Sequence, residues 1–463
     1  MALPTIRELL KSPGPKAGVV ARGWIKTRRD SKVMSFAELN DGSCRESLQI
    51  VFSQENGNFA GVLPSLVTGA AVEIQGDLVA SPAAGQKFEL QAKQVKLYGG
   101  CDPEKYPIQK KKASDEFLRT VAHLRPRTNK YAAMLRIRAE LAYSVHKYFH
   151  DKGFFYVHTP IITASDGEGA GEMFTATTLD LSNPPRTEKG EIDFSKELLG
   201  KKTYLTVTGQ LEGESLALAL GKIYTFGPTF RAENSNTYRH ASEFWMIEPE
   251  MAFYELEDDM ELAEDFIKSI TNSVLEGCPS DIELFAKFVE PALMDNLKNI
   301  TGNKFERLTY TDAVKLLEPV NERFDVKVSW GVDLASEHER FLVEQYFKKP
   351  VVLYNKPKDA AAFYMKLNDD GRTVRGMDVL VPRIGEVIGG SERENRLEVL
   401  EKKMADAGID PAGYWWYLDL RRYGSVPHSG FGLGFERMMM LVTGISNIRD
   451  VSAFPRVPGY AEF

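Results

Sequence analysis

Five short β-type runs lie close together between residues 18 and 98, and they constrain the fold more than any other feature of the chain. The runs are GVVARGWIKTRR, MSFAELND, SLQIVFSQ, AAVEIQGDLVA and FELQAKQVKLYG. Residues typical of turns separate them, as in 40–43 (NDGS) and 81–85 (SPAAG). Five short strands joined by turns within about 80 residues favour a small closed barrel.

The remainder of the chain shows a different pattern. Residues 101–128 are bounded by prolines and rich in charge, which predicts a basic hinge or linker. From Asn129, apolar residues recur at helical spacing up to Gly153, and β-type runs then alternate with helical ones. We therefore predict an α+β protein with a barrel over 1–100, the linker over 101–128, and a domain over 129–463. In that domain we expect a large antiparallel sheet flanked by helices.

Charge is divided unevenly along the chain. Residues 1–138 carry 22 Lys and Arg against 13 Asp and Glu, whereas the whole chain carries 58 against 65. A basic front joined to an acidic body indicates that a polyanion docks at the front. A solvated surface followed by a linker would produce the same charges, so charge alone does not decide between the two interpretations.

Composition excludes several classes of protein. Hydrophobic residues make up 43% and charged residues 27% of the chain, as in ordinary globular proteins. No run approaches the roughly 18 apolar residues of a membrane span, and the first residues lack the apolar core of a secretory signal. The three cysteines (Cys44, Cys101 and Cys278) are far apart, which argues against disulfides and for a reducing, cytoplasmic setting. The chain contains neither a Walker phosphate loop nor HExxH, so zinc catalysis is not expected.

One polar segment between two β-type flanks is a candidate phosphate site. Residues 230–245 (FRAENSNTYRHASEFW) predict a hairpin that brings Arg231, Arg239 and His240 together. The planar fork of arginine suits phosphate oxygens, and Phe244 offers a face to a base. A salt-bridged surface hairpin is the alternative interpretation.

A second candidate lies near the end of the chain. In residues 430–437 (GFGLGFER) glycines precede Glu436 and Arg437, and an apolar helical run follows. Glycines there would let a flat ligand lie against the backbone, with Arg437 at the helix start facing a phosphate. A tightly packed corner between a strand and a helix explains the same pattern.

These two segments resemble known motifs. FRAENSNTYRHASEFWMIEPE resembles motif 2 of the class II aminoacyl-tRNA synthetases, specifically their aspartate, asparagine and lysine subgroup, and GFGLGFERMMM resembles motif 3. GFFYVHTPIIT, with Pro160, resembles motif 1, which forms the dimer interface in that family. The barrel resembles the anticodon-binding OB-fold of the subgroup, with Arg28, Phe36 and Gln49 as the anticodon-binding residues. The resemblance spans nearly the whole chain in the family's order, and it implies a homodimer with an N-terminal OB-fold β-barrel and a class II catalytic domain.

Within the subgroup the chain resembles the asparagine-specific branch. The segments concerned are SDGEGAGEMF, TGQLEGES, EFWMIEPE, IGEVIGGSEREN and PRVPGYAEF. Aspartate-specific members usually carry a lysine where this chain has Gly213, and such a cation would neutralise a substrate carboxylate. The resemblance implies that Glu248 accepts a hydrogen bond from the asparagine NH₂ group while Arg393 donates to its carbonyl oxygen. The implied amino-acid-binding residues are Glu168, Thr208, Gln210, Glu248 and Arg393.

The resemblance also implies how ATP is bound. Arg231 would hold the α-phosphate, while Arg239, His240 and Arg437 would lie near the γ-phosphate, and Arg231, His240 and Arg437 would be catalytic. The implied ATP-binding residues are Arg231, Glu233, Arg239, His240, Phe244, Glu386, Gly434 and Arg437. Asp378 and Glu386 are the implied Mg²⁺ ligands, since that ion prefers oxygen. Ordinary acidic residues on a strand would be the alternative for these two.

The implied function is ATP-dependent ligation of L-asparagine to tRNA(Asn) through an asparaginyl-adenylate, with neither a membrane nor DNA as partner. Three alternatives remain: an aspartyl-tRNA synthetase of relaxed specificity, a synthetase-like asparagine-forming ligase, and an RNA-binding relative without catalysis. The asparagine-forming ligase normally lacks an anticodon barrel, and a relative that had lost catalysis would be expected to have lost some of the motif residues. No role is assigned to the polar segment 180–202.

Overall fold

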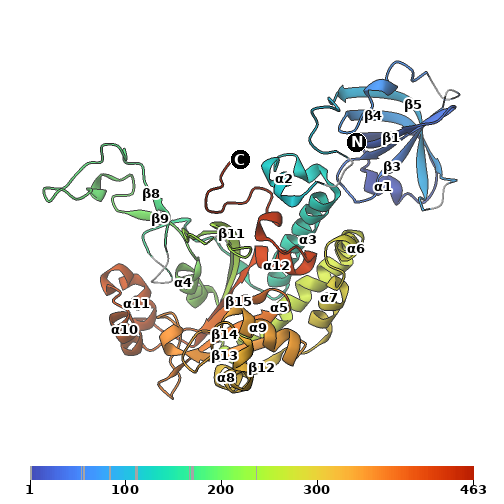
Figure 1. Ribbon diagram of the computed structural model, residues 1–463. Helices are drawn as coiled ribbons and strands as arrows, with labels where there is room; N and C mark the ends of the chain where they lie inside the picture. The colour runs from blue at the N-terminus through green and yellow to red at the C-terminus, as the bar shows by residue number, and fades with distance from the viewer. Residues whose placement is uncertain are drawn as a thin grey trace. The chain divides into compact units, whose positions relative to one another are not determined.

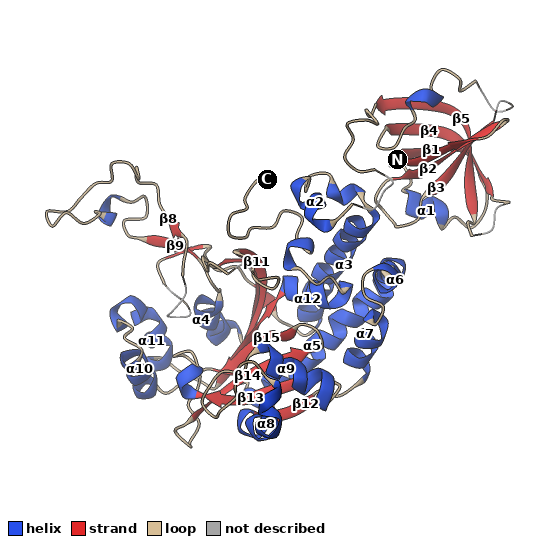
Figure 2. Cartoon of the chain, viewed as in Figure 1, coloured by secondary structure: helices blue, strands red, loops and turns tan. Residues whose placement is uncertain are grey.

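The chain divides into two compact units, Met1–Arg136 and Ile137–Phe463 (Figure 1). The computed structural model describes residues 3–53, 55, 58–82, 85–109, 113–165, 167, 172–235 and 237–463. Figure 2 shows strands dominating the first unit and a mixture of helices and strands in the second. In the part of the chain described, no helix is both long and apolar enough to cross a membrane.

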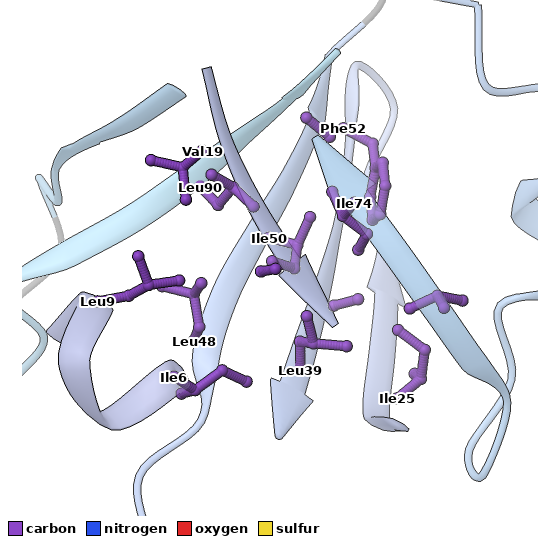
Figure 3. Packing of buried hydrophobic residues seen from close by; sticks show 14 of the residues in the cluster. Ile6, Leu9, Val19, Ile25, Leu39, Leu48, Ile50, Phe52, Ile74 and Leu90 are labelled. Carbon is purple, nitrogen blue, oxygen red and sulfur yellow. The ribbon is translucent and has the colours of Figure 1, made fainter. Parts of the chain in front are cut away.

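The first unit contains the predicted closed barrel. Its five strands are β1 (Lys16–Asp30), β2 (Met34–Asn40), β3 (Leu48–Ser53), β4 (Ala71–Ala80) and β5 (Phe88–Gly99). They close in the order β1-β2-β3-β5-β4, with β3 and β5 parallel and the other neighbouring strands antiparallel. Helix α1 (Ile6–Leu10) adds Ile6 and Leu9 to a core that includes Leu48, Ile50 and Leu90 (Figure 3). The five β-type runs and their turns therefore predicted this barrel correctly.

Helical structure begins within the segment predicted to be a linker. Helix α2 (Asp115–Thr120) starts after Ser114, whose side chain accepts a hydrogen bond from the backbone of Phe117. Helix α3 (Asn129–Asp151) follows, and the boundary between the two units falls inside it, after Arg136.

The second unit is built on one eight-stranded sheet. Its order is β12 (Glu306–Thr309), β13 (Val351–Pro357), β14 (Thr373–Val381), β15 (Gly385–Glu392), β16 (His428–Gly434), β11 (Glu243–Ala252), β10 (Lys222–Phe230) and β6 (Phe155–Tyr156). The six strands from β13 to β10 are antiparallel, whereas the outer pairs β12–β13 and β10–β6 are parallel. The predicted antiparallel sheet is thus correct for the centre, but the sheet as a whole is mixed. Long crossovers join the members of both parallel pairs, as parallel pairing requires.

Helices flank this sheet, as predicted. They are α4 (Gln210–Leu220), α5 (Leu256–Gly277), α6 (Pro279–Phe288), α7 (Leu293–Gly302), α8 (Tyr310–Leu317), α9 (Ser336–Arg340), α10 (Leu397–Asp406), α11 (Trp415–Arg422) and α12 (Phe435–Thr443). In α5, buried residues recur every three to four positions, from Leu256 and Met260 to Ile270 and Val274. This spacing gives the helix one apolar face that packs against the sheet.

A small separate sheet completes the second unit. Its strands are β7 (Ile162–Thr163), β9 (Thr203–Leu205) and β8 (Thr175–Ala176). The polar segment 180–202 lies in the connection from β8 to β9. The carboxylate of Glu197, near the end of this connection, accepts hydrogen bonds from the hydroxyls of Thr177 and Thr178 at its start.

Candidate active site

A cavity of about 190 Å³ is lined by residues of the 230–245 segment, β15, β16 and α12. All eight residues that the sequence assigned to ATP line this cavity. They are Arg231, Glu233, Arg239, His240, Phe244, Glu386, Gly434 and Arg437. The fold therefore brings together the two segments in which the sequence placed candidate phosphate-binding residues.

The predicted hairpin positions Arg231 and Phe244. Strand β10 ends at Phe230 and β11 begins at Glu243, and Phe230 pairs with Glu243 in the antiparallel ladder. Arg231 and Phe244 are the next residues along the chain after this pair. The guanidinium carbon of Arg231 lies 5.5 Å from the centroid of the Phe244 ring. A cation and an aromatic face thus stand side by side at the open end of the hairpin.

Arg239 is fixed from outside the hairpin. Its Nη1 donates to the carbonyl oxygen of Ile384 at 2.6 Å, and its Nη2 donates to the hydroxyl of Ser336. Ser336 and Ile384 follow Arg239 by 97 and 145 positions, so no local pattern could indicate that they hold this side chain. Arg239 also lines the cavity.

His240 is held in an electropositive environment. Its Nδ1 lies 2.6 Å from the Thr237 hydroxyl and 3.1 Å from that of Ser235. Burial lowers the pKa of His240, and Arg437 is the first of three arginines that lower it further. The imidazole is therefore neutral at pH 7, where it can still donate or accept one hydrogen bond.

Arg437 contacts one of the predicted metal ligands. Its Nη1 donates to the backbone oxygen of Glu386 at 3.0 Å and lies 3.4 Å from the Glu386 Oε2. Burial would raise the pKa of Glu386, but Arg437, Lys356 and Arg231 outweigh burial and hold the pKa below its ordinary value. Glu386 therefore presents a negative charge between the arginines.

Glu436 and Arg138 are site residues that the sequence analysis missed. Glu436 accepts hydrogen bonds from the backbone nitrogen of Trp245 (2.8 Å) and from Arg138 Nη2 (2.9 Å). These contacts join α3 and β11 to the first turn of α12, next to Arg437. Arg138 and Glu436 are 298 positions apart, so no local pattern could reveal the pair.

A second cavity of about 240 Å³ shares four lining residues with the first: Arg231, Met246, Glu386 and Gly432. Four of the five predicted amino-acid-binding residues line it, namely Thr208, Gln210, Glu248 and Arg393. Asp378 lines it too. The fifth predicted amino-acid-binding residue, Glu168, lies outside the described residues. A small substrate in this cavity would therefore adjoin a nucleotide in the first.

Glu248 is engaged by the residues around the start of α4. Its carboxylate accepts from the hydroxyl of Thr208, from the backbone nitrogen of Gly209 (3.1 Å) and from the hydroxyl of Thr225 (2.8 Å). The side chain is almost fully buried. These contacts place Glu248 next to Gln210 and do not include Arg393.

Arg393 instead pairs with Glu250. Its Nη2 lies 2.5 Å from Glu250 Oε1 and its Nε lies 3.2 Å from Oε2, while Nη1 donates to the Ser391 hydroxyl at 2.8 Å. The close packing depends on Gly430, because a Cβ there would lie 2.4 Å from the Glu250 carboxyl carbon. The resemblance implied Glu248, and not Glu250, as the residue that binds the substrate amide together with Arg393. Glu248 and Glu250 share a strand face, because they are two residues apart.

A buried polar network beneath the second cavity also escaped the sequence analysis. The Glu214 carboxylate accepts from Gln210 Nε2 (3.1 Å), the Tyr417 hydroxyl (2.8 Å) and Arg421 Nη2 (2.8 Å), and lies 3.1 Å from His428 Nε2. Burial opposes ionisation of Glu214, but Arg421 and His428 outweigh burial and hold its pKa well below the usual range. The network thereby fixes the orientation of the Gln210 amide.

The two predicted metal ligands face the same space. Lys356 Nζ lies 2.7 Å from Asp378 Oδ2. Gly389 lies close to both acids, because a Cβ there would lie 3.0 Å from Glu386 Oε1 and 3.7 Å from Asp378 Oδ1. In the described part of the chain no cluster of three or more Asp, Glu, His or Cys could hold a metal. Two adjoining carboxylates fit Mg²⁺, which commonly takes one or two carboxylates together with substrate phosphates and water.

In the barrel the structure brings two of the three predicted anticodon-binding residues together. Arg29 links them: its guanidinium lies 5.0 Å from the Phe36 ring centroid, and its Nη2 lies 3.4 Å from Gln49 Oε1. Arg28, the third predicted residue, precedes Arg29 on β1 and therefore points to the other face of the strand. Its Nη2 contacts Asp30 at 3.2 Å. Arg29 is thus a candidate that the sequence analysis missed.

Comparison with family models gives two matches. Residues 114–458 match the family of tRNA synthetases class II (D, K and N), and residues 19–98 match the OB-fold nucleic acid binding domain. The first match contains every residue of the two cavities, and the second covers the five strands of the barrel apart from their outermost residues.

Individual proteins are similar along the full chain. An asparagine--tRNA ligase of Nostoc sp. is 56% identical over 458 residues, which is 99% of each chain. One of Nitratidesulfovibrio vulgaris is 55% identical over 458 residues, again 99% of each. The solved structure of asparaginyl-tRNA synthetase from Pyrococcus horikoshii complexed with asparaginyl-adenylate is 30% identical, with a TM-score of 0.86. That match covers 100% of this chain and 99% of the other.

Proposed function

The chain belongs to the class II tRNA synthetases of the aspartate, lysine and asparagine group, and on that premise we propose that it joins asparagine to tRNA. The reaction proceeds through an asparaginyl-adenylate and releases AMP and pyrophosphate. The full-length similarity to asparagine--tRNA ligases favours this function over the aspartate-specific and non-catalytic alternatives. The observation that carries it in the structure is a cavity rich in arginine adjoining one that contains the Arg393–Glu250 pair.

In the first step we assign phosphate binding to the arginines. Arg231 holds the α-phosphate, where the asparagine carboxylate attacks the phosphorus and pyrophosphate leaves, and Arg239 and Arg437 hold the departing phosphates. His240, which is neutral, contributes a hydrogen bond to them. No side chain acts as a nucleophile, because positioning and charge neutralisation supply most of the acceleration of such a transfer. Asp378 and Glu386 would hold Mg²⁺, which neutralises phosphate charge when bound.

We assign the asparagine side chain to Arg393 and Glu250. Two of the five guanidinium N–H groups of Arg393 bind Glu250 and one binds Ser391, so two remain for a carbonyl oxygen. Glu250 can accept from the NH₂ group of the amide. Gln210 and Glu248 also line this cavity, and we assign them to the substrate ammonium, as we do Glu168.

Pyrophosphate exchange tests the function directly. Incubating the protein with ATP, labelled pyrophosphate and each of the twenty amino acids in turn should give exchange with asparagine far above all others. Exchange with aspartate at a comparable rate would support the aspartate-specific alternative. No exchange with any amino acid would support the RNA-binding alternative.

The barrel is proposed to read the anticodon of tRNA(Asn). Phe36→Ala should raise the KM for tRNA about tenfold, because stacking of one base on an aromatic ring contributes ~1–3 kcal/mol. Exchange without tRNA should not change. Tyr98→Ala is the matched control, since Tyr98 is an exposed aromatic that contacts Arg22 on β1 and Glu73 on β4. A loss of tRNA-independent exchange in the Phe36 variant would instead assign a structural role to Phe36.

We also propose a homodimer formed through α3 and β6, the edge strand of the large sheet. Tyr143 on α3 is 65% exposed, and Phe155 and Tyr156 on β6 are each 54% exposed, which leaves an aromatic surface beside unpaired backbone groups. Sedimentation should give twice the chain mass of 51.9 kDa. Phe155→Asp should yield monomers, whereas Phe288→Asp, at a site on α6 that is 65% exposed, should not. A monomeric unaltered protein at micromolar concentration would contradict the proposal.

The proposed setting of the reaction is the cytoplasm. Each of the three cysteines is a free thiol in the structure, which suits a reducing compartment. The partners proposed are tRNA(Asn), asparagine and ATP, with neither DNA nor a membrane. Fractionation of cells that express the chain at its natural level would test this location.

A further inference from the structure

Lys356 is a largely buried cation that lines the second cavity, and no step of the proposed reaction uses it. Its side chain is only 15% exposed, and its ammonium group lies 2.7 Å from Asp378 Oδ2. It stands where the ladder between β13 and β14 is irregular: the register shifts between Tyr354 and Lys356, and the intervening Asn355 has a φ of 59°. Such irregularities commonly direct a side chain into a functional site.

The two predicted metal ligands each have a cation partner, but of different kinds. Glu386 contacts Arg437, whose guanidinium also lines the nucleotide cavity. Asp378 contacts Lys356, which lines only the second cavity. Asp378 is itself only 12% exposed, and a buried carboxylate without a partner would be costly. Lys356 therefore balances the charge of Asp378 when no other cation is present.

We propose that Lys356 is the resident counter-ion of Asp378 and that it makes metal binding depend on the nucleotide. In the nucleotide-free protein its ammonium group occupies the Asp378 oxygen that a divalent cation would need. ATP adds phosphate oxygens and several negative charges beside Glu386, and this addition shifts the balance toward the metal. The four-carbon stem of lysine lets the ammonium group move away from Asp378 at that point. This inference rests on the proposed function, because it uses the metal ligands assigned there.

A lysine that only supports the position of Asp378 would have the opposite effect when removed. Loss of a support disorders Asp378 and weakens metal binding in every state. If Lys356 instead competes with the metal, its removal leaves the carboxylates of Asp378 and Glu386 available to the metal. Metal binding without nucleotide then becomes stronger. The direction of the change in metal affinity therefore separates the two roles.

Mn²⁺ provides the probe, since its free form is measured directly by electron paramagnetic resonance. The full-length protein is titrated with Mn²⁺ at pH 7.5, with and without a non-hydrolysable ATP analogue. Without nucleotide, Lys356→Met should bind Mn²⁺ at least tenfold more tightly than the unaltered protein, and Lys356→Gln should change in the same direction. Lys356→Arg, which keeps the charge, should behave like the unaltered protein. Lys358→Gln is the matched control, because Lys358 is an exposed lysine two residues along.

Three further results complete the test. Adding Asp378→Asn to Lys356→Met should remove the gain, which assigns the new affinity to this site. With the ATP analogue, the unaltered and Lys356→Met proteins should bind Mn²⁺ within about threefold of each other. Unchanged or weaker Mn²⁺ binding without nucleotide in both neutral variants, shown to be folded by thermal melting, would overturn the proposal. The proposed function is tested separately, because asparagine-dependent exchange by the unaltered protein does not depend on this result.

Discussion

Replacing Arg231 or Arg437 with alanine is expected to lower asparagine-dependent pyrophosphate exchange by at least about 100-fold, which corresponds to ~3 kcal/mol of transition-state stabilisation. Both guanidinium groups line the cavity assigned to ATP. Charge builds on the phosphate oxygens as the carboxylate attacks, and a fixed cation stabilises that charge without reorganisation. The melting temperature should stay close to that of the unaltered protein for Arg231→Ala, since the side chain lies beside Phe244 at the cavity lining and outside the hydrophobic core.

Conservative and distant variants distinguish this role from a general loss of charge. Arg231→Lys keeps the charge but loses the two-pronged donor geometry, so exchange should fall by roughly tenfold and not to background. Arg422→Ala is the control, because Arg422 is 37% exposed on α11, lines neither cavity, and pairs with Asp419 and Glu401. Pyrophosphate exchange should be unaffected in Arg422→Ala. Normal exchange in either Arg231→Ala or Arg437→Ala would remove the assignment of the cavity to ATP.

The parts of this protein that the sequence predicted are those encoded in neighbouring residues. Alternating apolar residues and turns between 18 and 98 predicted the barrel because each strand and turn is a local pattern. The residues that line the first cavity could be predicted to lie together for a related reason: most of them fall within two short segments of the chain. The parallel edges of the large sheet were missed, because pairing of β6 with β10 depends on a crossover of more than 60 residues.

The residues that the sequence could not place are those fixed by distant partners. Lys356 meets Asp378, and Glu214 meets Arg421 and His428 more than 200 positions away. A subtler ambiguity concerned residues on the same strand face. Glu248 and Glu250 are equivalent in the alternating pattern of β11. The register with β16 sets Glu250 opposite Gly430, and the side-chain contacts show that Glu250 is the carboxylate that reaches Arg393.

This register leads to a second prediction with a large expected effect, on the choice between asparagine and aspartate. Glu250→Gln should lower the asparagine-to-aspartate ratio of kcat/KM by about 10- to 100-fold. In the unaltered protein at pH 9, where Glu250 is ionised, its carboxylate neutralises Arg393 and faces the substrate as a negative charge, so aspartate meets repulsion and loses a hydrogen bond. The glutamine variant leaves the charge of Arg393 unbalanced, which favours a carboxylate. Activation of asparagine should fall while that of aspartate rises.

Two other variants separate Glu250 from its neighbours. Glu248→Gln should weaken activation of both amino acids without changing their ratio, because Glu248 is bound to Thr208, Gly209 and Thr225 on the side assigned to the common ammonium group. Arg393→Ala should damage both substrates, since each presents an oxygen to it. A change of ratio in Glu248→Gln with none in Glu250→Gln would restore the assignment made from sequence.

The dependence of the ratio on pH gives an independent check of the same carboxylate. Burial and the nearby Glu214 raise the pKa of Glu250 above its ordinary value, although Arg393 opposes them. Glu250 is therefore fully ionised, and rejects aspartate, only at a pH above this raised pKa. Its charge is lost as the pH falls through the raised pKa. Discrimination by the unaltered protein should weaken as the pH is lowered from 9 to 6, while the free aspartate carboxyl, with a pKa of about 3.9, stays ionised throughout. In Glu250→Gln the ratio should be flat over this range, because the titrating group is gone and steps common to both amino acids cancel. A ratio that still changes with pH in the variant would place the discriminating charge on a different residue.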